Sequence, residues 1–260
     1  MLASIRIIAW REWKTNYAKV LPVFFKLMTP AMSVLLFTMV FASSSNVITY
    51  KDHQYRYVEY LIPGLICVLT TAMVHLAHHS IIADKQSGIM PILITSGVSL
   101  RTYVIARSIS NTFFEITRLS ILFVAAIFLL KTQYFLGVQN IATLLFTLSL
   151  LSLFWYSLGI LVAIFINNQS LKDLFFGFAM MIVPIASPAY FNITLAPQWI
   201  QGIAKYNPLT FSCREVRRAL LDSNFTPVST DFIILFSITF IAYALMLIFS
   251  EKLSTLLFER

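Results

Sequence analysis

The chain has 260 residues, of which 58% are apolar and only 12% are charged. A soluble domain carries about 25% charged residues, so this composition excludes an ordinary soluble globular protein and favours a membrane as the solvent. The formal net charge is +8. The basic residues lie mostly between apolar blocks, which favours membrane flanks and anionic lipid headgroups over nucleic acid as their partners.

The first 19 residues form a polar segment ahead of the first apolar block. They include Arg6, Arg11 and Lys14, so a signal peptide is not expected. Apolar residues recur on one helical face at spacings of three and four, namely Leu2, Ile5, Ala9, Trp13 and Tyr17. This pattern predicts an amphipathic helix lying in the headgroup plane. The alternative is a simple basic leader that orients the first span.

Long apolar segments dominate the rest of the chain. A membrane-spanning helix needs about 20 mainly apolar residues. Six segments are of this type: 20–41, 58–83, 104–130, 141–166, 174–190 and 232–249. The sequence therefore predicts an all-α membrane protein, with an interfacial helix over 1–19 and one membrane domain over 20–260. The Lys and Arg residues near the spans favour both termini on the cytoplasmic side.

Two connections between the predicted spans are more than short loops. Residues 84–106, on the cytoplasmic side, mix apolar and polar residues, which predicts either a helix that docks on a partner or a helix on the membrane surface. Residues 191–231, on the outside, are too short and too polar to cross the membrane twice. They predict a re-entrant or extracellular helical segment whose broken backbone is shielded by protein.

No nucleotide-binding motif is present. The sequence lacks G-x-x-x-x-G-K-[ST], the phosphate-binding loop of many ATPases. We therefore expect no cofactor in this chain. Active transport would then need a partner ATPase or an ion gradient.

Three histidines follow the H-x-x-H-H spacing of membrane di-iron enzymes, His75, His78 and His79. Imidazoles at this spacing on a helix are able to hold a metal. Such enzymes need several histidine clusters, whereas the chain has four histidines in all. The fourth, His53, lies on the opposite side of the membrane in the predicted topology. We predict no metal site here, and a membrane metalloenzyme is the alternative function.

The third predicted span contains two opposite charges. A charge inside a span costs about 2.5–3.5 kcal/mol, which makes Glu115 and Arg118 candidates for a functional role. Their spacing of three lets them pair along one helix face. They belong either to a subunit seam or translocation path, or to a self-neutralised structural pair.

Three segments resemble the ABC-2 type permease family. Residues 195–211 read LAPQWIQGIAKYNPLTF and are similar to a family signature that is followed by an arginine, which Arg217 or Arg218 supplies. Residues 60–65 read YLIPGL, like a motif in the family's second span. Residues 84–101 resemble the loop after that span. Four residues match the signature directly and are expected in an extracellular gate: Asn207, Pro208, Leu209 and Thr210.

The resemblance implies the permease subunit of an ATP-driven exporter in the inner membrane. A separate ABC ATPase would hold ATP and Mg²⁺, and a second permease copy would complete a homodimer in the lipid. The implied cargo is hydrophobic and drug-like, lipid-linked or a polysaccharide. The residues expected to contact the ATPase are Asp84, Ser87, Gly88, Ile89, Ile92, Leu93 and Arg101. A membrane scaffold without transport activity is the structural alternative.

Overall fold

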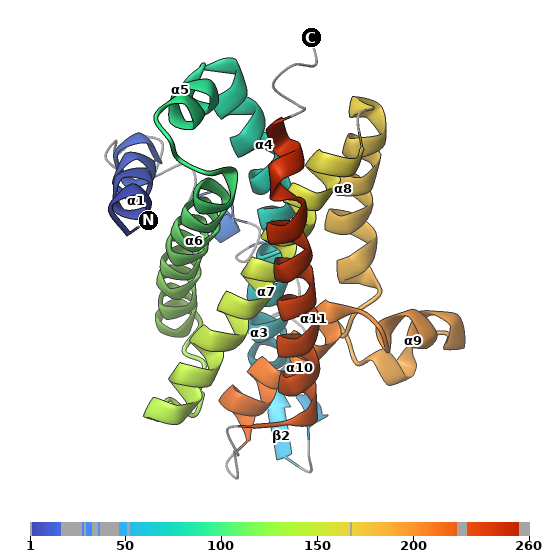
Figure 1. Cartoon of the computed structure of the whole chain (residues 1–260). Helices are drawn as coiled ribbons and strands as arrows, with labels where there is room; N and C mark the ends of the chain where they lie inside the picture. The colour runs from blue at the N-terminus through green and yellow to red at the C-terminus, as the bar shows by residue number, and fades with distance from the viewer. Residues whose placement is uncertain are drawn as a thin grey trace.

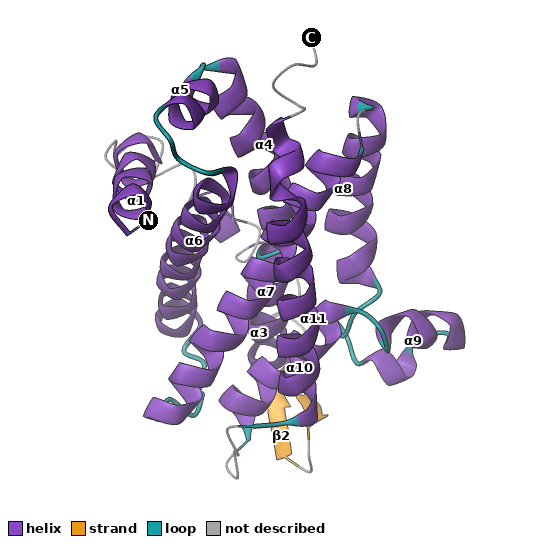
Figure 2. Cartoon of the chain, viewed as in Figure 1, coloured by secondary structure: helices purple, strands orange, loops and turns teal. Residues whose placement is uncertain are grey.

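The computed structural model describes residues 2–16, 28, 30–32, 36, 47–50, 53–166, 168–222 and 228–254. Most of the predicted first span, 20–41, therefore lies outside the described residues. Long helices and one small hairpin form the described part of the molecule (Figures 1 and 2). The elements, labelled as in Figure 1, are α1 (Leu2–Asn16), β1 (Val47–Tyr50), β2 (His53–Arg56), α3 (Tyr57–Leu69), α4 (Ala72–Gln86), α5 (Ile89–Thr95), α6 (Leu100–Leu130), α7 (Val138–Phe165), α8 (Gln169–Ile185), η1 (Ile193–Leu195), α9 (Gln198–Ala204), α10 (Pro208–Leu221), α11 (Thr230–Phe249) and η2 (Ser250–Ser254).

Four helical stretches among the described residues are long and apolar enough to cross a membrane. They are Tyr57–Gln86, Leu100–Leu130, Val138–Phe165 and Thr230–Leu253. These stretches overlap the second, third, fourth and sixth predicted spans. Helix α8 overlaps the fifth, but at 17 residues it is shorter and is not one of the four. The structure thus shows a multi-span helical protein, and the six-span arrangement stays a prediction.

The predicted second span is broken in its middle. Helix α3 ends at Leu69 and α4 begins at Ala72. The hydroxyl of Thr70 donates to the Cys67 carbonyl at 2.6 Å, and that of Thr71 donates to the Val68 carbonyl at 2.7 Å. Threonine hydroxyls that bond back to the preceding turn compete with the helical ladder. The break therefore lies at two threonines and not at Pro63, which α3 accommodates.

Helix α7 lies at the centre of the bundle. It packs against α4, α6, α10 and α11, while α10 also packs against α3 and α11. Helix α1 packs against α6 at the edge of the bundle, and α8 and α9 lie on the opposite edge (Figure 1). The packing of α7 is apolar, with Leu151 and Ile160 almost fully buried. This central helix fixes the positions of the outer ones.

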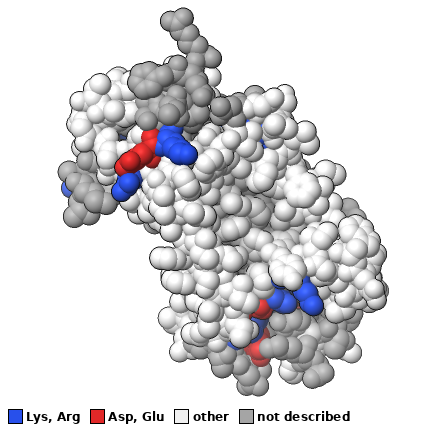
Figure 3. Space-filling view, turned by 45° about the vertical axis from the view of Figure 1, so that its right-hand side comes forward, with Lys and Arg blue, Asp and Glu red and all other residues white. Residues whose placement is uncertain are grey.

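The bundle has two distinct ends. At one, the α5 end, an ion pair of 2.9 Å between Arg101 and Glu251 joins the start of α6 to η2, and α1 and α5 lie on the same side (Figure 1). At the other, the hairpin end, β1 pairs antiparallel with β2. On the face shown in Figure 3, charged residues gather near both ends and a broad uncharged band separates them. This distribution fits a bilayer around the middle.

The hairpin departs from the all-α prediction. Val47 pairs with Arg56, and Tyr50 pairs with His53. The strands are only four residues each, which is the shortest length at which alternation indicates a strand. The hydroxyl of Tyr55 donates to the carbonyl of Leu221. The hairpin is thereby attached to the end of α10.

Close packing of α4 against α7 depends on Gly159, and this contact yields a prediction. A Cβ at this position would overlap the carbonyl oxygen of Val74 and lie 2.8 Å from the Cβ of Ala77. We expect Gly159→Ala to lower the free energy of unfolding by about 1–3 kcal/mol, as overpacking does. Unfolding in mixed detergent micelles measures the change.

Gly177→Ala is the matched control, because no atom lies within 4 Å of a Cβ at that position on α8. It should leave stability unchanged or raise it by about 0.5–1 kcal/mol, since alanine is the better helix former. Equal behaviour of the two variants would show that α4 and α7 do not approach as closely as described.

Candidate functional site

The segment expected to contact an ATPase contains the short helix α5. Gly88 and Gly97 flank it, with positive φ angles of 71° and 80°, a conformation that glycine adopts at little cost. Met90 is 1% exposed and anchors the helix to the core, whereas Ile92 is 63% exposed. Ile89 and Leu93 are half-buried. Among the three apolar residues expected to make the contact, Ile92 is therefore the most fully presented.

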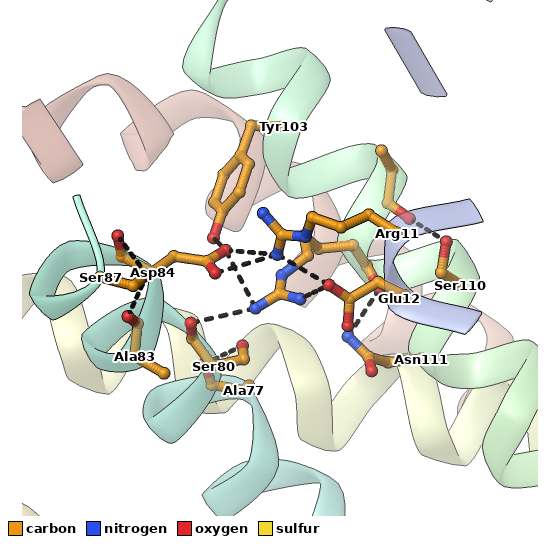
Figure 4. Close-up of polar contacts among 12 residues, drawn as sticks. Arg11, Glu12, Ala77, Ser80, Ala83, Asp84, Ser87, Tyr103, Ser110 and Asn111 are labelled. Carbon is orange, nitrogen blue, oxygen red and sulfur yellow. Dashed lines mark hydrogen bonds and ion pairs between the residues drawn. The ribbon is translucent and has the colours of Figure 1, made fainter. Parts of the chain in front are cut away.

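A buried charge cluster lies next to α5, and we call it the α5-end cluster: Arg11, Glu12, Asp84, Tyr103 and Arg107. Figure 4 shows Arg11 and Glu12 of α1 facing Asp84 of α4 and Tyr103 of α6. Asp84 accepts hydrogen bonds from Arg11 at 2.9 Å and from the Tyr103 hydroxyl at 2.6 Å. Arg107 pairs with Asp84 at 3.1 Å and also with Glu12. One carboxylate thus links three helices.

The α5-end cluster is electrically balanced and mostly buried, with Arg11 its most accessible side chain at 26% exposure. Two arginines face two carboxylates, and the side chains of Glu12, Asp84 and Arg107 are 3%, 7% and 5% exposed. Burial by itself lowers the pKa of Arg11, but the hydrogen bond and charge of Asp84 outweigh it, so its pKa lies above the ordinary value. Arg11 therefore keeps its positive charge in the folded protein. Arg107 also donates to the Ser80 carbonyl at 3.0 Å.

Sequence reasoning singled out Asp84 from this cluster but missed the other four members. Arg11 and Arg107 counted there only as charges that orient the chain. A usable signal exists, because Arg107 lies within the predicted span 104–130 and a buried arginine needs a carboxylate. Glu12 is the acid that meets it, 95 residues away in the sequence, and nothing local reveals that pairing.

A second cluster, the hairpin-end cluster, surrounds Arg217 of α10. This side chain is 2% exposed. Its guanidinium donates to the carbonyls of Tyr60, Pro188 and Ala189 at 2.9, 2.6 and 2.8 Å. Its central carbon lies 3.6 Å from the centroid of the Tyr60 ring, a cation–π contact. Arg217 therefore satisfies the backbone carbonyls exposed where the chain turns after α8.

Asn207 extends the hairpin-end cluster from the same motif. Its amide donates to the carbonyls of Val183 and Ala186 at 2.8 and 2.9 Å, and its side-chain oxygen accepts from the Leu209 amide at 3.0 Å. It thus caps α10 and binds the last turn of α8 at once. Pro208 opens α10, where its missing N–H costs nothing. Asn207 therefore joins α8 to the start of α10, where the four residues expected in a gate lie.

Gly64 completes the hairpin-end cluster. A Cβ there would overlap the carbonyl oxygen of Ala189 and lie 2.7 Å from an Arg217 nitrogen. The Pro-Gly step of α3 therefore allows the chain after α8 to approach α3 closely. Two segments that the resemblance singled out, 60–65 and 195–211 with its following arginine, meet at this point. Arg217, and not Arg218, is the buried one.

The comparisons with known proteins agree with this architecture. A family described as ABC-2 type transporter matches residues 3–221. The chain belongs to the ABC-2 type transporter family. It is 24% identical over 236 residues to the inner membrane transport permease YadH of Escherichia coli K12, covering 86% of this chain and 88% of the relative. The YadH proteins of Escherichia coli O157:H7 and Shigella flexneri match to the same extent. The chain is thus a membrane transporter subunit.

The charged pair of the third predicted span lies within α6. Arg118 donates to Glu115 at 2.5 Å, and the Glu115 side chain is 6% exposed. Arg118 is more accessible, at 20%. The geometry shows a self-neutralised pair along one helix face.

The histidines do not form the metal centre of a di-iron enzyme. Within the described part of the chain, no three His, Cys, Asp or Glu residues are arranged to hold a metal ion. His75, His78 and His79 lie on α4, whereas His53 lies on β2 at the hairpin end. The metalloenzyme alternative therefore has no support in the described residues.

The α5-end cluster yields a prediction about stability. Arg107→Ala leaves two buried carboxylates facing one arginine, and removing one partner of a buried pair costs about 3–5 kcal/mol. Arg101→Ala breaks a pair whose side chains are 57% and 66% exposed, which costs less than about 1 kcal/mol. Unfolding of both variants in mixed micelles compares them. Similar small losses for both would show that the charge cluster is not buried.

The hairpin-end cluster yields a second prediction. Arg217→Lys keeps the charge but cannot donate to three separated carbonyls, because lysine offers a single ammonium. Losing two charge-assisted hydrogen bonds should cost about 3 kcal/mol. Arg218→Lys is the control, since Arg218 makes its ion pair with Glu215, which lysine preserves. A tolerated Arg217→Lys would remove Arg217 from the junction.

Proposed function

We propose that this chain is the permease subunit of an ATP-driven exporter of the inner membrane, working as a homodimer with a separate ABC ATPase. Membership of the ABC-2 family and the likeness to a protein named as an inner membrane transport permease support this proposal. The observation that carries it is α5, a helix that is anchored by Met90 and presents Ile92 to the outside. The ATPase would bind ATP and Mg²⁺, and this chain would hold neither.

The α5-end cluster offers a route by which a movement of the ATPase would reach the helices of the permease. Asp84 lies in the last turn of α4, just before Gly88 and α5. Its carboxylate is bonded to Arg11 of α1 and to Tyr103 and Arg107 of α6. A push on α5 therefore displaces α1, α4 and α6 together, because separating them would leave buried charges without partners. Rigid movement of packed helices is the kind of change that alternating access requires.

The chemistry of the bundle bears on the cargo. A cavity of about 270 Å³ lies between α6 and α7. Apart from Ser120 its lining is apolar, with residues such as Phe123, Ile127, Leu144 and Leu148. Such a lining suits hydrocarbon and excludes a bare charged solute. We therefore propose an amphiphilic cargo, either a drug-like compound or a lipid-linked molecule such as a polysaccharide precursor, moved outward.

Replacing Ile92 tests the contact with the ATPase. Affinity purification of the full chain from its native membrane in mild detergent, followed by quantitative mass spectrometry, should recover a P-loop ATPase in a ratio of about one to one. Ile92→Asp should remove most of it, because a buried carboxylate is strongly disfavoured at an apolar contact.

Ile92→Leu is the matched control and should retain the ATPase, since it keeps an apolar side chain of equal volume. Recovery of no P-loop ATPase with the native chain would refute the half-transporter proposal. Equal recovery with Ile92→Asp would instead refute only the role of α5. A purified complex whose ATPase activity does not respond to amphiphiles would favour a scaffold without transport activity.

A further inference from the structure

Two imidazoles lie one turn apart on α4 and have no role in the proposed transport cycle. His75 and His79 place their Nε2 atoms 3.0 Å from each other. Their ring centroids are 4.1 Å apart. His75 is half-buried and His79 is exposed, so the pair is accessible from outside the bundle. Ionisable groups within a membrane span are costly to place there, which makes this pair a candidate for a function of its own.

The separation of the two nitrogens matches a metal chelate. With metal–nitrogen bonds of roughly 2.0–2.1 Å, two ligands at a right angle lie roughly 2.8–3.0 Å from each other. Right-angle positions occur in the square-planar and octahedral environments that Cu²⁺ and Ni²⁺ prefer with nitrogen ligands. The Nε2 atoms of His75 and His79 already stand at this separation. The spacing of the two nitrogens therefore permits one ion to bind both of them.

Side chains of α8 that carry charges of both signs lie near the histidines. Asp173 of α8 lies close enough for its charge to act on His75 and His78. Phe176 of α8 packs on His75 with ring centroids 5.5 Å apart. His78 is buried beneath Phe176, and Lys172 acts on it from the same helix. The site therefore lies at the seam of α4 and α8, where the charge of Asp173 acts on His75 and the charges of Asp173 and Lys172 both act on His78.

We propose that His75 and His79 form a two-imidazole site for a divalent transition-metal ion of the copper or nickel type. Water or a further ligand fills the remaining positions, because no third protein ligand is arranged around an ion in the described residues. The site differs from a di-iron centre in having two ligands from one helical turn. It does not depend on the transport proposal, since binding is read directly on the permease chain.

Metal binding to the purified full chain, carrying no polyhistidine tag, tests the site. Isothermal titration with Ni²⁺ should show one ion per chain, and the electron paramagnetic resonance spectrum of bound Cu²⁺ should show coupling to two imidazole nitrogens. His75→Ala and His79→Ala should each abolish saturable Ni²⁺ binding and the two-nitrogen signal. Ni²⁺ should also raise the unfolding temperature of the native chain, because it binds only the folded helix.

His53→Ala is the control, because His53 lies on β2 at the hairpin end, and it should leave both signals unchanged. His79→Gln keeps a polar side chain of similar length and should still lose the ion, which separates ligation from any loss of fold. Saturable binding that survives in both alanine variants would overturn the proposal. Absence of binding to the native chain would also overturn it and leave a hydrogen bond between two imidazoles.

Discussion

Lipid hydrocarbon offers no hydrogen-bond partner, so each polar group within the bundle must find one in the protein. The hydroxyls of Thr70 and Thr71 return to carbonyls of the preceding turn. Arg217 donates to two carbonyls at the turn after α8 and to the Tyr60 carbonyl of α3. Asp84 binds the side chains of two arginines and a tyrosine. The polar groups thereby fix which helices must stay together, while the apolar packing fixes only how closely they approach.

The two clusters use this constraint in different ways. The α5-end cluster joins mainly side chains to side chains, with one bond from Arg107 to the Ser80 carbonyl, and its five members come from three helices. The hairpin-end cluster joins side chains to backbone, since Arg217 and Asn207 bind carbonyl oxygens. A backbone carbonyl cannot change its charge or leave its place in the chain. The hairpin-end cluster therefore fixes the local course of the backbone. Opposite charges on separate helices hold a set of helices together as they move.

The sequence predicts the parts of this protein that depend on composition over many residues. Apolar stretches of about 20 residues locate the helices of the four membrane-spanning stretches, and the polar start of the chain locates α1. What it does not predict depends on contacts between distant residues. Glu12 meets Arg107 across 95 positions, and Tyr55 reaches Leu221 across 166.

Local ambiguity accounts for other differences. Arg217 and Arg218 are adjacent on α10, and only the direction of each side chain makes the first buried and the second an ion-pair partner of Glu215. The break after Leu69 was equally hidden, because threonine also occurs within continuous helices. Proline is a frequent cause of helix kinks, yet α3 runs through Pro63. Pro63 is the seventh residue of α3 and removes one bond of the helical ladder. The Glu59 carbonyl that this bond would have used accepts from the Tyr134 hydroxyl at 3.3 Å.

The interruption at Thr70 and Thr71 divides one membrane crossing into two mechanical parts. Helix α3 is packed on α10, and α4 is packed on α7, α8 and α5. A continuous helix tilts as one rigid body, so a sideways displacement of one end moves the other end in the opposite direction. A helix that is interrupted at its midpoint transmits a displacement along its axis, but a tilt of one half need not tilt the other. Helix α3 is therefore able to keep its orientation while α4 tilts.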